Sequence, residues 1–194
     1  YTAVDSAESE PETADRVNRL GPAILGQLCR ENDLKLIHIS TVYVFDGTRN
    51  APLKETDPTN PLSVYGRTKL AGEKAVAASG CDAVVIRTGW LYSPFGSNFV
   101  KTMLRLGSEG VPVRVVDDQH GTQTYAADFA RAIIRIAENG IKGFDIYHYS
   151  DAGKTTWHGF AREIFSRAGI AARLEPITTA EYPTPARRPA YGVL

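Results

Sequence analysis

Apolar and polar positions follow two rhythms along the chain. Short apolar runs, typical of buried strands, occupy residues 35–40, 82–88, 111–119 and 144–150. Apolar residues three and four apart, typical of amphipathic helices, recur in segments 5–32, 64–79, 99–110, 125–140 and 155–170. Because apolar strands alternate with helices, the pattern predicts an α/β fold with a parallel sheet covered by helices on both faces.

Other segments lack both rhythms and are expected to be loops. Residues 41–63 form a long stretch rich in Pro, Asp, Asn and Thr, and loops of that length are usually functional or disordered. The tail, residues 175–194, also reads as a loop. Regular alternation gives way to a Pro- and Gly-containing loop near residue 92, which predicts a boundary between residues 1–92 and 93–194. Some segments of the second part are expected to return to the sheet.

Composition narrows the function classes. The chain has 194 residues, 43% of them hydrophobic, which is enough for one domain with a core and a small second lobe. Its 22 basic and 22 acidic side chains cancel, so charge gives no reason to expect nucleic acid or a membrane surface as a partner. Cys29 and Cys81 show no CxxC spacing, which favours reduced structural thiols and a cytoplasmic location.

Three polar residues form a candidate catalytic set. Thr41 directly follows an apolar strand, and the carboxyl ends of parallel strands are where ligands bind. Tyr65 and Lys69 are four residues apart on a predicted helix and therefore share a face. A nearby ammonium is expected to lower the pKa of a tyrosine and make it a better proton donor, while a threonine hydroxyl can bind a developing oxyanion. Together they suit protonation of a carbonyl oxygen as hydride arrives from a nicotinamide cofactor.

Other candidates favour simpler interpretations. His38 and Ser40 face the same side of a strand, but no G-x-S-x-G elbow accompanies them, so a core histidine is expected rather than a hydrolase. His148 and His158 lack metal-ligand spacing, and no metal site is predicted. Trp157 opens an amphipathic helix and is expected to pack in the core.

Several segments together resemble a known family. "ISTVYVFDG", "DPTNPLSVYGRTKLAGEKAV", "VIRTGWLYSPFGSNFV", "DDQHGTQTYAADFA" and "RRPAYGVL" resemble, in the same order, the dTDP-4-dehydrorhamnose reductases, which are extended short-chain dehydrogenases. The resemblance spans essentially the whole chain. It implies a partial Rossmann-like doubly wound sheet in residues 1–92 and a smaller substrate-binding lobe in residues 93–194.

The resemblance also implies roles for individual residues. Tyr65 would be the proton donor and Lys69 would tune it and hold the nicotinamide ribose, with NADPH or NADH as the cofactor. Thr41 would support the transfer and contact the dTDP-sugar. Thr2 would lie near the cofactor, and Trp90, which follows a strand end, would contact the nucleotide-sugar. The implied assembly stays open, with a homodimer as one option.

Two more substrate contacts are expected in this resemblance. The tail residue Arg188 would help to hold the diphosphate, because a guanidinium matches phosphate oxygens. Val42 stands where the family usually has aspartate. Valine cannot accept a hydrogen bond from a sugar hydroxyl, so Val42 either alters sugar recognition or simply suits an apolar segment.

Other functions remain open at this point. The glycine-rich phosphate-binding segment of the family does not occur in the sequence and is expected to precede Tyr1 in a longer protein. An epimerase or dehydratase of another nucleotide-sugar is an alternative, although a dehydratase usually places an acidic pair beside the threonine. A regulatory subunit resembling the β subunit of methionine adenosyltransferase is the non-catalytic alternative.

Overall fold

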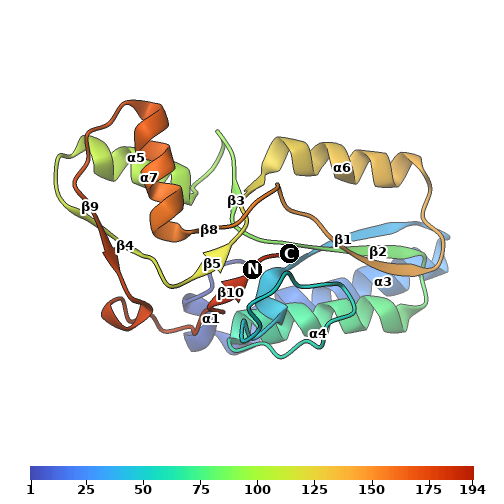
Figure 1. The fold of residues 1–194 in the computed structure, drawn as a ribbon. Coiled ribbons are helices and arrows are strands. Elements are labelled where there is room, and N and C mark those ends of the chain that lie inside the picture. The colour runs from blue at the N-terminus through green and yellow to red at the C-terminus, as the bar shows by residue number, and fades with distance from the viewer.

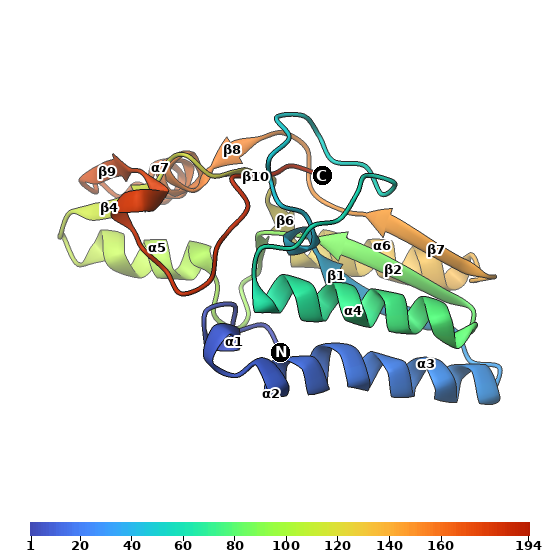
Figure 2. The same cartoon turned by 90° about the horizontal axis from the view of Figure 1, so that it is seen from below.

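A three-stranded parallel sheet forms the centre of the larger part of the molecule. The computed structural model describes residues 1–194. The strands are β1 (Leu36–Thr41), β2 (Ala83–Thr88) and β7 (Phe144–His148), in the order β1-β2-β7. Helices α3 (Gly21–Glu31) and α4 (Val64–Ser79) cover one face, and α6 (Ala126–Glu138) covers the other (Figures 1 and 2). The predicted doubly wound α/β arrangement is confirmed.

Alternation along the strands places different side chains on the two faces. Val84 and Ile86 of β2 pack with Phe129 of α6, whereas Leu36 of β1 packs with Val76 of α4. All six residues of β2 are buried. This explains why β2 reads as a continuous apolar run, since a strand covered on both faces needs apolar side chains on each. The two free cysteines lie in the cluster beneath this sheet.

The N-terminal segment forms a broken series of helical turns rather than the single helix expected. It comprises α1 (Ser6–Ser9), α2 (Pro11–Asp15), the π-helical turn η1 (Arg16–Leu20) and α3. The break falls at Glu10, because the ring of Pro11 disfavours a helical conformation in the residue before it.

The apolar stripe of this segment is exposed. Val17, Leu20, Ile24 and Leu28 are 48, 42, 50 and 47% exposed. The buried side of α3 instead carries small side chains, since it lies close against α4 (Figure 2).

The smaller part of the molecule is built from later segments. Strands β4 (Val113–Val116) and β9 (Leu174–Ile177) pair in parallel, and α5 (Phe99–Ser108) and α7 (Trp157–Ala168) pack with them. The core of this lobe consists of Met103, Val113, Val115, Phe160, Ala161, Ile164 and Phe165. Two-residue strands complete the lobe and its junction with the sheet: β3 (Leu91–Tyr92), β5 (His120–Gly121), β6 (Thr124–Tyr125), β8 (Thr155–Thr156) and β10 (Tyr191–Gly192).

The chain passes between the two parts more than once. After residue 92 it builds α5 and β4 in the lobe, returns to the sheet through α6 and β7, and re-enters the lobe at α7 (Figure 1). The tail is not simply a loop, because it contributes β9, the 3₁₀ turn η3 (Thr179–Glu181) and β10. None of the helices has the length and apolar character needed to cross a membrane.

Candidate active site

Thr41 lies at the carboxyl end of the sheet, as its position after an apolar run predicted. It is the last residue of β1, where it pairs with Thr88 of β2. It also begins the 3₁₀ turn η2 (Val42–Val44), and its hydroxyl oxygen accepts a hydrogen bond from the Tyr43 amide at 3.2 Å. The side chain is buried, so Thr41 is fixed in place by both a strand and a turn.

The first turn of α4 holds Tyr65 beside Tyr43. Ser63 caps the helix by accepting from the Gly66 amide at 3.1 Å. The two tyrosine rings meet edge to face with centroids 5.5 Å apart. A Cβ on Gly66 would lie 2.3 Å from the Tyr43 carbonyl oxygen, so glycine is what allows the helix to approach this closely.

Burial sets the protonation state of Tyr65. It raises the pKa of the phenol, and the side chain of Thr41 opposes that rise. The sequence predicted the opposite net direction, with Lys69 lowering the pKa. The reason for the difference is that burial of the phenol is the largest influence on its pKa. The Lys69 ammonium donates to the Ile39 carbonyl of β1 at 2.6 Å. Tyr65 is therefore a neutral phenol near neutral pH, the form a proton donor needs.

Lys69 is itself affected by its surroundings. Burial lowers the pKa of its ammonium, and the carboxylate of Glu73 opposes that fall. Because Glu73 is one helical turn beyond Lys69, both side chains project from the same face of α4 as Tyr65.

Two of the predicted site residues have less specific positions. Thr2 is exposed, in the N-terminal segment whose Tyr1 and Val4 pack against the cluster around Tyr65. Val42 is 1% exposed and packs with Val44, Phe45 and Leu53. Its methyl groups also fill the space beside the backbone of Gly89 and Gly192. The structure thus places Val42 in apolar packing rather than in open contact with a sugar site.

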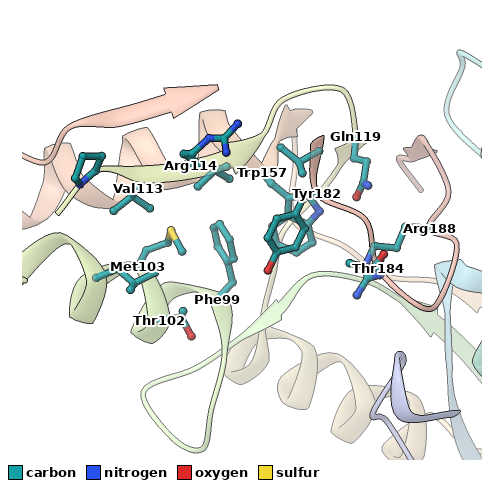
Figure 3. A pocket seen from close by; sticks show the side chains of 14 residues that line it. Phe99, Thr102, Met103, Val113, Arg114, Gln119, Trp157, Tyr182, Thr184 and Arg188 are labelled. Atoms are coloured by element: carbon teal, nitrogen blue, oxygen red, sulfur yellow. Dashed lines mark hydrogen bonds between the residues drawn. The ribbon is translucent and has the colours of Figure 1, made fainter. Parts of the chain in front are cut away.

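A cavity of about 440 Å³ opens in the smaller lobe. Figure 3 shows Phe99 and Met103 of α5 on one side and Val113 of β4 opposite them. Arg188 lies at the end nearer the larger part of the molecule (Figure 3). The wall is mostly apolar with a few polar groups, as ligand pockets generally are.

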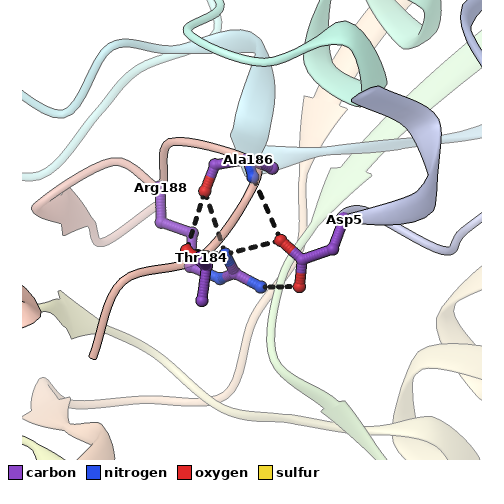
Figure 4. A network of polar contacts seen from close by, with 4 residues as sticks. All are labelled: Asp5, Thr184, Ala186 and Arg188. Carbon is purple, nitrogen blue, oxygen red and sulfur yellow. Dashed lines mark hydrogen bonds and ion pairs between the residues drawn. The ribbon is translucent and has the colours of Figure 1, made fainter. Parts of the chain in front are cut away.

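Arg188 lies between the cavity and Tyr43, the neighbour of Tyr65. Its guanidinium makes a two-pronged ion pair with Asp5, with N–O distances of 3.0 and 2.7 Å (Figure 4). It also donates to the Thr184 hydroxyl and the Ala186 carbonyl. The side chain acts on the phenol of Tyr43, whose pKa burial raises and Arg188 lowers. Asp5 thus holds in place the guanidinium that was predicted to meet a diphosphate.

The two tryptophans pack against each other in the smaller lobe. Trp90 does not line the cavity but stacks on Trp157, with centroids 3.6 Å apart and planes at 16°. Its backbone φ of 47° lies in the left-handed region, which is unusual for a bulky residue. Trp157 packs against the core of the smaller lobe, as predicted, and it also lines the cavity. Trp90 supports it from behind.

Sequence reasoning missed several residues around this site. Asp5 gave no signal, because its partner Arg188 is 183 residues away in the chain. Glu73 and Arg87 could have been found. Arg87 is a charged residue inside the apolar run of β2, and Glu73 follows Tyr65 and Lys69 at the same helical spacing. Charged residues at positions where the pattern predicts burial are typical of a buried ion pair.

Comparison with known proteins gives one consistent answer. The family model described as RmlD substrate binding domain matches residues 1–194. The dTDP-4-dehydrorhamnose reductase of Sinorhizobium fredii is 45% identical over 98% of this chain and 67% of its own length. The enzyme of the same name from Salmonella typhimurium is 43% identical over 97% of this chain and 66% of its own.

Solved structures agree with these relatives. A dTDP-4-dehydrorhamnose reductase from Clostridium acetobutylicum has a TM-score of 0.95 and 41% identity, over all of this chain and 68% of its own. The one from Bacillus anthracis, in complex with NADP, has a TM-score of 0.96 and 38% identity with the same coverage. The chain therefore spans about two thirds of the length of the relatives it matches. It belongs to the dTDP-4-dehydrorhamnose reductase family.

Proposed function

We propose that the full protein reduces the 4-keto group of dTDP-4-dehydro-L-rhamnose, giving dTDP-L-rhamnose, with NADPH or NADH as the reductant. The observation that carries this proposal is the buried neutral Tyr65 beside Thr41, at the carboxyl end of the sheet, with Lys69 one turn further along α4. Relatives that match over the whole chain carry the name of this activity.

Each residue of the set has a distinct role. Tyr65 donates its phenolic proton to the sugar O4 as negative charge develops there. The Thr41 hydroxyl donates a hydrogen bond to the same oxygen and stabilises that charge. The Lys69 ammonium stabilises the phenolate that Tyr65 becomes, because a nearby positive charge favours the ionised form.

The residues of this chain fit a nicotinamide cofactor. When bound, the reduced nicotinamide supplies hydride to the carbonyl carbon. An ammonium has three donors, and Lys69 uses one of them on the Ile39 carbonyl. The others are free for ribose hydroxyls, and the exposed hydroxyl of Thr2 lies in the neighbouring N-terminal segment.

The cavity of the smaller lobe suits the nucleotide part of the substrate. Phe99 and Trp157 offer aromatic surfaces for a pyrimidine base. Arg188 lies at the end of the cavity that leads to Tyr43 and Tyr65, where a diphosphate would join base to sugar. Trp90 acts on the substrate through Trp157, and Val42 shapes the backbone around Gly89.

The test is product formation by the full-length protein. We expect dTDP-4-dehydro-L-rhamnose and NADPH to give loss of nicotinamide absorbance together with dTDP-L-rhamnose, identified by mass and NMR. NADH in parallel reports the cofactor preference. A folded protein that binds NADPH but leaves this sugar unreduced would refute the proposal and favour another nucleotide-sugar or a regulatory role.

Location and assembly are part of the proposal. The buried free thiols Cys29 and Cys81 suit the reducing cytoplasm. The exposed apolar stripe on η1 and α3 is a surface on which two copies of the full protein could pair. Light scattering of the full-length protein measures this directly, and a monomer mass at micromolar concentration would exclude the homodimer.

A further inference from the structure

A buried polar network lies directly behind the catalytic residues. Glu73 of α4 and Arg87 of β2 form an ion pair with an N–O distance of 2.7 Å, and each side chain is 3% exposed. A second guanidinium nitrogen of Arg87 donates to the same carboxylate at 3.0 Å. The Ser40 hydroxyl, on β1, donates to Glu73 as well. A carboxylate at this depth needs such partners, because an unpaired buried charge is costly.

The position of this network links it to the reaction. Ser40 directly precedes Thr41, and Arg87 directly precedes Thr88, the residue that pairs with Thr41. Glu73 lies one helical turn beyond Lys69 and two beyond Tyr65. The network therefore connects the catalytic face of α4 to the ends of β1 and β2, the strands that carry Thr41 and Thr88.

Glu73 is also the only acid that faces Lys69. The other titratable groups around that ammonium are the phenol of Tyr65, His38 on β1 and the amino group of Tyr1. Tyr65 is neutral near neutral pH, and the other two offer no negative charge. His38 is half-buried, and its buried Nε2 has no hydrogen-bond partner.

We propose that Glu73 is a positioning residue for the reaction. Together with Ser40 and Arg87, it fixes α4 against the strand ends and supplies the negative charge that keeps Lys69 in its ammonium form. This inference rests on the proposed function, because it assigns the reductive roles to Tyr65 and Lys69.

The direct test is Glu73→Gln in the full-length protein, with Lys74→Gln as control. Lys74 is the next residue of α4, but it is exposed. Glu73→Gln removes the negative charge that acts on Lys69 and leaves Arg87 without its ion-pair partner. As pH rises on the alkaline side of the profile, we expect kcat/KM of Glu73→Gln to fall about tenfold further than that of wild type. The reason is that loss of the carboxylate favours the neutral amine form of Lys69. The control should keep the wild-type profile.

A second readout is independent of substrate. NMR of protein carrying isotope-labelled lysine, with Lys69 assigned from Lys69→Arg, should show Lys69 titrating at lower pH in Glu73→Gln. If both the Lys69 titration and the pH profile match wild type while only the melting temperature falls, Glu73 is merely structural and the proposal is wrong. If wild type does not reduce the sugar, the proposed function fails, but the Lys69 titration still decides the role of Glu73.

A double variant keeps the proposal testable if Glu73→Gln does not fold. Glu73→Leu with Arg87→Met replaces the ion pair by apolar side chains, an exchange that proteins often tolerate. Lys69 should again titrate at lower pH, because its acid is gone. An unchanged titration in this folded double variant would also overturn the proposal.

Discussion

Burial sets the charge state of the ionisable side chains around the end of β1. It raises the pKa of Tyr65 and lowers the pKa values of Lys69 and His38. At the scale of single residues, the sequence predicted that Tyr65 and Lys69 share a face of one helix and that Thr41 ends a strand, which the structure shows. It could not supply the directions of their pKa shifts, because these depend first on which side chains the fold desolvates.

His38 should make stability depend on pH. Its pKa falls from 6.5 to about 4, chiefly because burial disfavours the charged ring. Between these values the unfolded chain binds a proton that the folded chain does not, so stability is complete above the unfolded pKa and is lost as pH falls toward the folded one. The loss is at most about 3 kcal/mol. Urea unfolding from neutral pH down to pH 4 should show a weaker pH dependence for His38→Leu than for wild type. Equal slopes would contradict this assignment.

At the scale of elements, the close packing of α4 against its neighbours depends on glycines. A Cβ on Gly72 would lie 2.0 Å from the backbone oxygen of Asn18 in η1. The bounds of α4 were predicted from its apolar pattern. The need for glycine in α4 was not predicted, because it arises from contact with η1, which only the fold brings close. The break in the N-terminal helix was missed although its cause, Pro11, stands in the sequence. The short strands of the tail were missed for another reason. Strands of two residues carry no periodicity.

Replacing Gly72 tests this packing. We expect Gly72→Ala to destabilise the full-length protein by about 1–3 kcal/mol, because a backbone oxygen has little freedom to move aside. Gly21→Ala is the matched control, since Gly21 is helical and its nearest neighbour to a new Cβ is 3.8 Å away. That change should be neutral or stabilising by up to ~1 kcal/mol. Equal melting temperatures for the two variants would show that α4 and η1 can separate without cost.

The Asp5–Arg188 ion pair connects the two parts of the whole molecule. It joins the segment before α1 to the tail after η3 (Figure 4). It also places a guanidinium between the cavity and Tyr43. Sequence motifs predicted Arg188 as a substrate contact, but the contact that orients it spans almost the entire chain. The stacking of Trp90 on Trp157 is likewise visible only in the fold, since the two residues lie far apart in the chain.

Releasing Arg188 should weaken substrate binding more than catalysis. In Asp5→Asn the guanidinium loses its charged partner and its fixed orientation, so KM for the nucleotide-sugar should rise about five- to tenfold with a smaller change in kcat. Asp15→Asn is the control, because it removes an exposed ion pair with Arg19. Steady-state kinetics of both variants decide the matter. A KM that is unchanged in Asp5→Asn would show that Arg188 does not contact the substrate.

The central claim is that Tyr65 delivers the proton, and Tyr65→Phe tests it most directly. This change keeps the ring that packs against Tyr43 and removes only the hydroxyl. In the full-length protein we expect kcat for keto-sugar reduction to fall by ~10²–10⁴, with little change in KM or in NADPH binding. A kcat within a few-fold of wild type, in a variant that folds and binds the cofactor, would contradict the account.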